Sequence, residues 1–322
     1  MKSFWKNKKV LVTGGTGFVG SYVAKILAEK GADVTVTTSN TKNNKNTFKH
    51  GKVKIADLTN LQDCLIATKD QEIVFHFAAL DGGVSFKKTH PAEMFRANVG
   101  MTVNVVEACK ENGVERVLLM SSIDIYPKAT RSPFQEKYGY RHTTVDDLTG
   151  YAWAKLVGEI TGSLYKSEYN LQIAIIRAGN IYGPGDYIET ERARVIPSFI
   201  SQALQNKDIH IIGNGDQERS FLYISDFAQA ALNAAEFYAI GDPVNVSGTN
   251  YISIKRLAEM IIGQVKSSSK IILEKKDMSL PKDRTISVTK AKKKLRFKEH
   301  VSLDEGLAET IASLKTYYEK TK

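Results

Sequence analysis

The spacing of three glycines near the N-terminus constrains the fold of this chain more than any other feature. Gly14, Gly17 and Gly20 lie three residues apart, between an apolar run at 10–12 and a helical pattern at 22–30. In a strand–turn–helix unit, such glycines make the sharp turn, let the backbone approach a pyrophosphate and let the helix pack closely on the strand. The N–H groups at the start of the helix also favour phosphate. We therefore predict a dinucleotide-binding turn, with contacts from Gly14, Thr16, Gly17, Phe18, Val19 and Gly20.

Strand-like and helix-like segments alternate after this turn. Further apolar strands are expected at 34–37, 53–55, 73–77, 117–120 and 173–176, and helices at 61–67, 92–112 and 151–169. This alternation predicts an α/β fold, a doubly wound parallel sheet covered by helices on both faces. Ligands of such sheets bind beyond the carboxyl ends of the strands, so the functional residues should follow each strand.

The residues after the second strand bear on the choice between NAD and NADP. A carboxylate there would hold the ribose 2′-hydroxyl of NAD, but the chain has Thr38 and Ser39, with Lys42 and Lys45 nearby. Hydroxyls and lysines would accept a 2′-phosphate, and no arginine is present to strengthen that contact. The sequence therefore allows either cofactor and slightly favours NADP.

The next two strands are also followed by candidate cofactor contacts. Asp57 and Leu58 follow the third strand, where the carboxylate could accept a hydrogen bond from the adenine amine. Phe77, Ala78 and Ala79 follow the fourth strand, and the two alanines would let the backbone approach the cofactor.

Four residues in the middle of the chain form a candidate catalytic group. Tyr151 and Lys155 lie four residues apart at the start of a helical pattern, so they share one helix face. An ammonium near a phenol lowers the pKa of the phenol, which makes a general base near neutral pH. Ser122 and Asp124 follow the fifth strand and would point to one side of it. We expect Ser122 to hold a substrate hydroxyl against Tyr151.

Composition limits the classes of partner. The chain has 322 residues, which is enough for a large α/β domain and a smaller one, and 42% are hydrophobic. Its net charge is +10, but the lysine-rich stretches 42–54 and 290–298 lack the interleaved aromatic residues of a nucleic-acid platform. We therefore expect an anionic small-molecule ligand, no nucleic acid and no metal.

The cysteine count and the apolar runs indicate a location. The chain has two cysteines, Cys64 and Cys109, which suggests reduced thiols in a cytoplasmic protein. The glycine turn ends the first apolar run too early for a signal peptide, and no run is long enough to span a membrane. We expect no membrane partner.

Taken together, the chain resembles the extended short-chain dehydrogenases/reductases, in the NAD(P)-dependent nucleotide-sugar epimerase/dehydratase family. Residues 13–20 match the TGxxGxxG pattern of this family, and Ser122, Tyr151 and Lys155 match its catalytic triad. Further similarities lie at Asp57-Leu58, 76–79, Asn98, 177–184, 194–197, 213–215, 219–226 and 302–307. The resemblance therefore covers nearly the whole chain.

The resemblance implies an architecture and further contacts. It implies a Rossmann domain at 1–176, with a strand and helix returning near 221–237, and a smaller nucleotide-sugar-binding domain mainly at 177–322. Asn98, Tyr151 and Lys155 would also contact the cofactor. The implied substrate contacts are Ser122, Asn180, Arg194, Val195, Arg219 and Arg284. A homodimer would form through the helices at 98–112 and 151–169.

The resemblance leaves the reaction open. Members oxidise or reduce a sugar carbon, usually C4, and 4,6-dehydratases carry Asp-Glu where this chain has Ile123 and Asp124. Isoleucine cannot protonate a leaving hydroxyl, so dehydration is disfavoured. The run 125–128 is similar to that of GDP-fucose-synthase-type enzymes, which weakly favours a GDP-sugar. Asp124 could move protons beside a ketone or only shape the pocket, and His142 could be a second acid or a solvated loop residue.

We therefore expect an epimerase that removes and returns a hydride at C4, with Tyr151 as base. The alternative is a nucleotide-sugar C4 dehydrogenase or 4-keto-sugar reductase. A 4,6-dehydratase is less favoured, and so is a cofactor-binding regulator without catalysis, because Tyr151 and Lys155 are both present.

Overall fold

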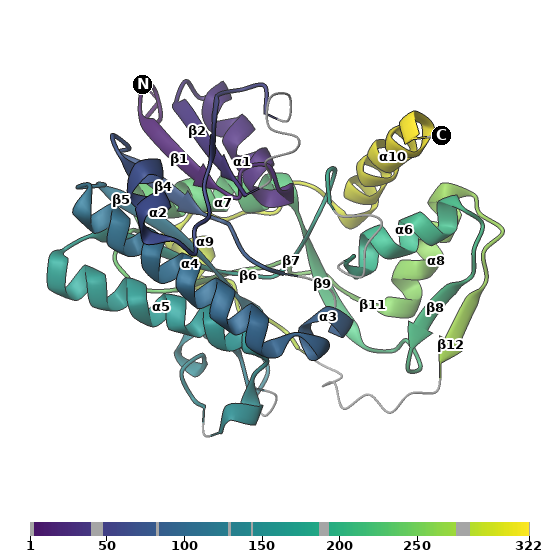
Figure 1. The fold of residues 1–322 in the computed structure, drawn as a ribbon. Helices are drawn as coiled ribbons and strands as arrows, with labels where there is room; N and C mark the ends of the chain where they lie inside the picture. The colour runs from purple at the N-terminus through teal and green to yellow at the C-terminus, as the bar shows by residue number, and fades with distance from the viewer. Residues whose placement is uncertain are drawn as a thin grey trace.

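A parallel sheet forms the centre of the larger part of the molecule (Figure 1). The computed structural model describes residues 3–39, 48–81, 84–127, 130–142, 144–186, 193–274 and 284–321. Within these ranges seven strands pair in the order β10-β6-β5-β4-β1-β2-β3, and every pairing is parallel. The strands are β1 (Lys9–Thr13), β2 (Asp33–Thr38), β3 (Lys52–Ile55), β4 (Ile73–His76), β5 (Arg116–Ser122), β6 (Gln172–Ala178) and β10 (Val244–Val246).

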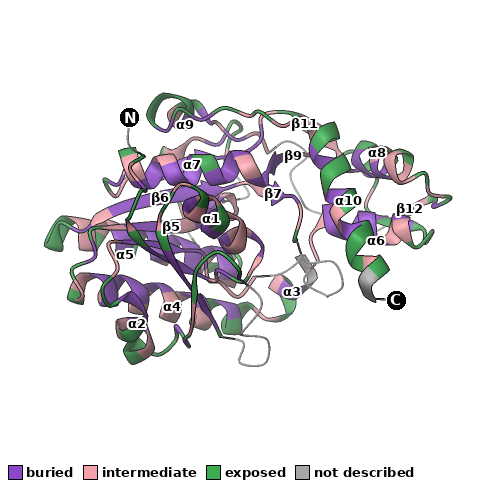
Figure 2. Cartoon of the chain, turned by 90° about the horizontal axis from the view of Figure 1, so that it is seen from above, coloured by how far each residue is buried: buried purple, intermediate pink, exposed green. Residues whose placement is uncertain are grey.

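Helices cover both faces of this sheet, because its strands carry apolar side chains on both sides. Val10 and Val12 of β1 belong to a core with α1 (Phe18–Glu29) and α7 (Ile224–Phe237). Leu11 points the other way, into a core with α2 (Leu61–Thr68), α4 (Pro91–Glu111) and α5 (Gly150–Tyr169). Buried residues accordingly gather on the sheet and on the inner helix faces (Figure 2). The predicted doubly wound parallel sheet is confirmed.

The remaining elements form a smaller part, which lies beside the carboxyl ends of the strands (Figure 1). It contains two small sheets and three helices of ten or more residues, among the residues that the structure describes. The first sheet has the order β11-β9-β7, and the second pairs β12 with β8. The bounds are β7 (Asn180–Tyr182), β8 (Ile209–Ile212), β9 (Glu218–Tyr223), β11 (Tyr251–Ser253), β12 (Ile271–Glu274), α6 (Val195–Leu204), α8 (Ile254–Val265) and α10 (Leu303–Thr321).

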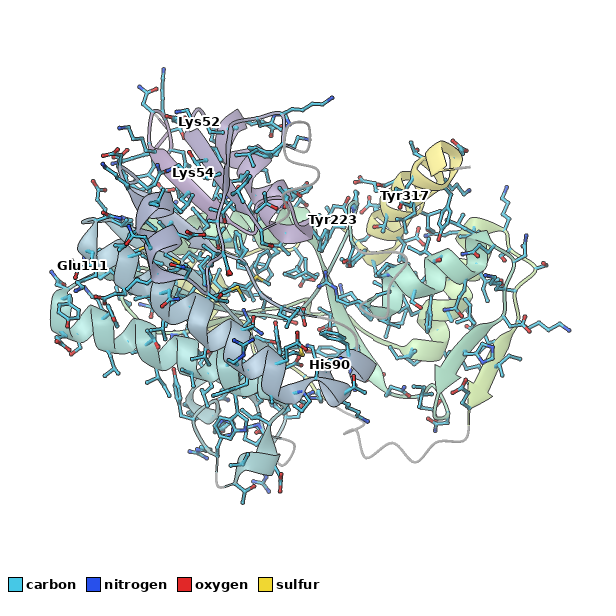
Figure 3. All side chains as sticks on the ribbon, in the orientation of Figure 1. Lys52, Lys54, His90, Glu111, Tyr223 and Tyr317 are labelled. Carbon is cyan, nitrogen blue, oxygen red and sulfur yellow. The ribbon has the colours of Figure 1, made fainter. Side chains whose placement is uncertain are left out.

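Five short helices complete the described secondary structure. They are α3 (Val84–Thr89), α9 (Thr289–Lys294), η1 (Ile123–Ile125), η2 (Glu136–Tyr138) and η3 (Val145–Asp147). At the junction, the Tyr223 hydroxyl at the end of β9 donates a hydrogen bond to Glu309 of α10. Figure 3 shows Tyr223 beside α10, between the two parts. No described helix combines the length and apolar character needed to cross a membrane.

The segment expected to return to the large sheet does so only in part. The helix is α7, which packs on α1 and on β5 and β6. The strand differs from the expectation, because β9 pairs with β7 and β11 in the small sheet and β10 joins the edge of the large one. Both strands are short and carry buried apolar residues, which do not indicate the sheet that each strand joins.

A buried ion pair lies where β5, β6 and α5 meet. Arg177 donates through Nε to Glu159 Oε1 at 2.9 Å and through Nη2 to Oε2 at 2.7 Å, and both side chains are completely buried. Arg177 Nη1 also donates to the Tyr126 hydroxyl at 3.0 Å. Hydroxyls of Ser121 and Tyr140 donate to Glu159. Each charge is therefore both paired and hydrogen-bonded, as a buried charge must be to persist.

Candidate active site

The glycine turn packs against the loop that follows β4. Gly14 has φ +63°, and a Cβ placed on it would lie 2.9 Å from the backbone of Ala78. A Cβ on Gly20 would lie 2.3 Å from the Gly14 oxygen, so the turn and α1 approach as closely as backbone allows. The Thr16 hydroxyl donates to that of Thr38 at 3.1 Å. The ends of β1, β2 and β4 therefore meet at one edge of the sheet.

This edge fits a dinucleotide. Gly17 is the N-cap of α1, so no side chain covers the first N–H groups of the helix, and no acidic residue lies in its first turn. Phe18 and Val19 begin the helix, and Ser39 is exposed just after β2. Unoccupied helix-start donors and an absence of negative charge there suit a pyrophosphate. Lys42 and Lys45, which bear on NADP, lie outside the described residues.

The other predicted cofactor residues are placed around the same edge. Asp57 is exposed, and the hydroxyl and backbone N–H of Thr59 donate to it, which keeps the pKa of Asp57 below its usual value. Leu58 and Phe77 are buried, and Ala79 is half-buried. These positions are compatible with the predicted cofactor contacts, which stay a prediction.

Asn98 binds the backbone of the loop that follows β4. Its amide donates to the carbonyls of Leu80, at 2.9 Å, and Met94, at 2.8 Å, and accepts from the Leu80 N–H at 2.8 Å. Asn98 therefore holds the loop after β4 in place. The direct cofactor contact that the resemblance implied stays a prediction.

The predicted catalytic residues lie at the end of β5 and the start of α5. The Thr149 hydroxyl caps α5 by accepting from Ala152 N at 3.3 Å, which sets Tyr151 in the first turn. Lys155 Nζ donates to the Met120 carbonyl at 2.8 Å and lies 5.6 Å from the centre of the Tyr151 ring. The Ser122 hydroxyl accepts from the Asp124 N–H at 3.1 Å. Tyr151 and Ser122 are buried, and burial lowers the pKa of Lys155 to about 8.

The predicted direction of the Tyr151 shift is wrong for this structure. Burial raises the pKa of the Tyr151 phenol, because a phenolate there loses its hydration. Asp81 and Asp124 raise this pKa further, while Lys87 and Arg194 lower it. The expectation considered only Lys155 and left out both the burial and the two carboxylates.

Lys87 and Asp81 are functional candidates that the sequence analysis missed. Lys87 Nζ lies 2.8 Å from Asp124 Oδ2, 3.3 Å from Asp81 Oδ1 and 4.0 Å from the centre of the Tyr151 ring. Lys87 is the main cause of a lowered pKa at Asp124. Asp81 follows the end of β4, so the expectation that functional residues follow each strand could have identified it. No sequence motif or regular residue spacing marks Lys87.

Three predicted substrate arginines lie within electrostatic reach of this group. Arg284 and Arg219 both lower the pKa of Asp124, and Arg194 lowers that of Tyr151. Arg194 also pairs with Asp186 at 2.7 Å. The three arginines thus act electrostatically on the predicted catalytic residues. Positive charge there would attract a diphosphate.

The contacts described for the other predicted positions do not include the Tyr151 group. Val195 begins α6, and the Asn180 amide at the start of β7 donates to the Ser220 carbonyl at 2.9 Å. His142 lies 2.8 Å from the Gly139 carbonyl through Nε2, and its ring packs on Trp153 at 5.0 Å. These contacts of His142 do not include Tyr151 or Asp124, so they favour a structural loop residue over a second acid.

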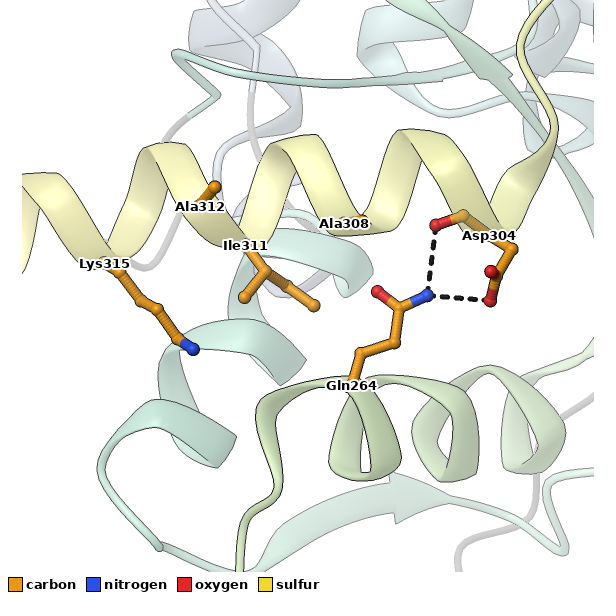
Figure 4. Close-up of a pocket in the computed structure, with 6 residues that line it drawn as sticks. All are labelled: Gln264, Asp304, Ala308, Ile311, Ala312 and Lys315. Carbon is orange, nitrogen blue, oxygen red and sulfur yellow. Dashed lines mark hydrogen bonds between the residues drawn. The ribbon is translucent and has the colours of Figure 1, made fainter.

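A cavity of about 400 Å³ lies elsewhere, between α8 and α10 (Figure 4). The Gln264 amide spans it by donating to the Asp304 carbonyl at 3.0 Å and carboxylate at 2.8 Å. Its lining, Gln264, Asp304, Ala308, Ile311, Ala312 and Lys315, includes none of the predicted site residues. Across the described ranges, no group of three or more His, Cys, Asp or Glu side chains could hold a metal ion.

Comparisons with known proteins agree with this geometry. The model of the NAD dependent epimerase/dehydratase family matches residues 10–247. The chain is 31% identical to a dTDP-4-dehydro-6-deoxy-D-allose reductase of Streptomyces sp over 278 residues, covering 84% of this chain and 85% of the relative. It is 31% identical to a UDP-N-acetyl-alpha-D-glucosaminuronate decarboxylase of Bacillus cytotoxicus over 319 residues, covering 94% and 97%. Among solved structures, a UDP-N-acetylglucosamine 4-epimerase of Methanobrevibacter ruminantium superposes with a TM-score of 0.85 at 26% identity, covering 97% and 99%.

Proposed function

Because this chain belongs to the NAD dependent epimerase/dehydratase family, we propose that it is an NAD(P)-dependent nucleotide-sugar epimerase that removes a hydride from C4 of the sugar and returns it. The observation that supports the proposal is that Lys155 lies 5.6 Å from the Tyr151 ring centre and donates to the Met120 carbonyl of β5, the strand that ends at Ser122. The family relationship and this arrangement support an enzyme in preference to a regulator that only binds the cofactor.

The residues present suffice for the proton steps. Ser122 would donate a hydrogen bond to the substrate hydroxyl and hold it toward Tyr151, which would take the hydroxyl proton as the C4 ketone forms. Bound NAD(P) would supply the acceptor, and later the donor, of the hydride. Tyr151 would then give the proton back once the opposite face of the sugar is presented. Lys155 would stabilise the phenolate between these steps.

A C4 dehydrogenase or 4-keto-sugar reductase is the second candidate. Two observations favour it: the similarity to a protein named as a 4-keto-sugar reductase, and the lack of an acid at Thr38 and Ser39, which suits NADPH. A 4,6-dehydratase is less favoured. Dehydration needs a protonated group beside the leaving hydroxyl, whereas Lys87 keeps Asp124 ionised and Ile123 carries no proton.

The substrate would be held by its diphosphate. Arg219 and Arg284 suit this role, because a guanidinium can give two charge-assisted hydrogen bonds to phosphate oxygens. The preference for a GDP-sugar stays a prediction, while the two relatives above carry names with dTDP and UDP. A melting-temperature panel with GDP, UDP and dTDP tests it, and a rise with UDP or dTDP alone would contradict it.

We also propose a homodimer and a cytoplasmic location. The outer faces of α4 and α5 leave large apolar side chains in solvent: Leu164 is 60% exposed, Ile160 44% and Phe95 38%. Large apolar side chains exposed on two helices that pack together are compatible with a self-association surface. The division into parts at 1–176 and 177–322 likewise stays a proposal.

The decisive experiment compares cofactor use with product structure. The purified protein is examined for bound cofactor by absorbance, then incubated with nucleotide sugars and followed by NMR. An epimerase interconverts two sugars with no net change in added cofactor, whereas a reductase consumes NADPH with a 4-keto sugar. Tyr151→Phe should abolish either activity and keep cofactor binding. Undiminished turnover by this variant would contradict the proposal.

A further inference from the structure

A lysine held between two carboxylates lies against the ring of Tyr151. This Lys87 cluster consists of Asp81 from the loop after β4, Lys87 from α3 and Asp124 from η1. The Lys87 side chain is only 18% exposed, whereas each carboxylate is 37% exposed. The ammonium is therefore enclosed, and the carboxylates form its outer side.

The ammonium group of Lys87 lies close to the ring of Tyr151. Its Nζ lies 4.0 Å from the ring centre, well inside the range of about 6 Å over which a cation is attracted to an aromatic face. The attraction grows when the phenol is deprotonated, because part of the phenolate charge is spread over the ring. Lys155 lies farther from the same ring centre, at 5.6 Å, and its ammonium is engaged by the Met120 carbonyl.

Charged groups from several neighbouring elements act on Tyr151. Asp81 and Asp124 oppose its ionisation, and Lys87 and Arg194 favour it. Lys155 lies one turn along α5. Without Lys87, the two carboxylates would face the phenol with their nearest counter-charge removed. Its loss would therefore change both the charge balance at Tyr151 and the protonation of Asp124.

We propose that Lys87 is a positioning residue that favours the phenolate form of Tyr151 and holds Asp124 as an ionised carboxylate beside the substrate. The inference rests on the proposed role of Tyr151 as the base. It assigns Lys87 no direct contact with the substrate. The role depends on the charge of Lys87 more than on its shape, so arginine should replace it in part.

The test measures Tyr151 ionisation directly and through activity. Burial already holds the Tyr151 pKa above its usual value, so phenolate absorbance of the full-length protein is titrated from about pH 6 to the highest pH at which the protein stays folded, with Tyr151→Phe as the reference. The rise of kcat/KM with pH is measured over the same range and reports the same ionisation. Lys87→Met should raise the Tyr151 pKa by about one pH unit or more, since a cation this close favours the charged phenol. At pH 7 its kcat/KM should fall about tenfold and recover as the pH rises.

Two variants sharpen the test. Lys87→Arg should keep most of the wild-type profile, and Asp81→Asn should move the Tyr151 pKa in the opposite direction, downward. Lys88→Met is the matched control, because Lys88 is the exposed neighbour on the same helix and should leave the profile unchanged.

The outcomes separate this inference from the proposed function. If Lys87→Met and wild type give the same titration and the same pH profile, or if Asp81→Asn shifts the pKa upward, the inference is wrong. If Lys87→Met does not fold, the shifts in Lys87→Arg and Asp81→Asn decide. If no nucleotide sugar is turned over but the phenolate shifts follow these signs, the proposed function fails and the electrostatic role of Lys87 stands.

Discussion

The Glu159–Arg177 pair allows a quantitative test of how the site is supported. Glu159→Gln keeps the size of the side chain and removes its charge, so the fully buried guanidinium of Arg177 loses its only paired carboxylate among the described residues. The amide N–H group would also face the donors of Arg177. A Cβ on Gly139 would lie 2.5 Å from this guanidinium, so the backbone is packed closely against it.

The expected loss of stability is large. Removing one partner of a buried, hydrogen-bonded ion pair costs about 3–5 kcal/mol, because the remaining charge stays without a partner in a dry environment. At roughly 2 °C per kcal/mol, the lower end of the range for large domains, Tm should fall by about 6–10 °C. Chemical denaturation and calorimetry measure both quantities.

The control is an exposed pair on another helix. Lys25 and Glu29 are 3.8 Å apart, with more than half of each side chain in solvent. Glu29→Gln should change stability by less than about 0.5 kcal/mol. Adding Arg177→Met to Glu159→Gln should restore part of the loss, because no unpaired charge is then buried. Equal effects of Glu159→Gln and Glu29→Gln would refute the reasoning.

Three further predictions follow from the site. Burial lowers the pKa of His76 to about 3, so below about pH 6.5 the unfolded chain takes up a proton that the folded chain does not. The free energy of unfolding should therefore fall by about 1.4 kcal/mol for each pH unit as the pH is lowered from 6.5 to 3. His76→Gln should reduce this slope in urea denaturation. Gly20→Ala should weaken NAD(P) binding by at least about tenfold in calorimetric titration, because its Cβ would strike the Gly14 carbonyl and displace the turn; unchanged affinity would argue against a cofactor at this turn. Leu164→Glu should convert the proposed dimer to a monomer in light scattering, and a wild-type monomer would contradict the proposed interface.

Local spacing explains what was predictable. The glycine turn, the alternating strands and the pair Tyr151–Lys155 depend on neighbours within a few residues, so the sequence indicates them directly. Lys87 was not predictable, because its contacts to Asp81 and Asp124 arise when α3 packs beside η1. The sign of the Tyr151 pKa shift was missed for the same reason: burial and through-space charge are properties of the folded site.

Helix α5 shows how little freedom this fold leaves to one of its elements. Its first turn carries Tyr151, the next turns carry Lys155 and Glu159, and its outer face carries Ile160 and Leu164. The helix thus carries the proposed base, one partner of the buried ion pair and the proposed self-association surface. A change of substrate preference, whether by evolution or by engineering, should therefore arise in the loops at the strand ends, while the sequence of α5 stays constant.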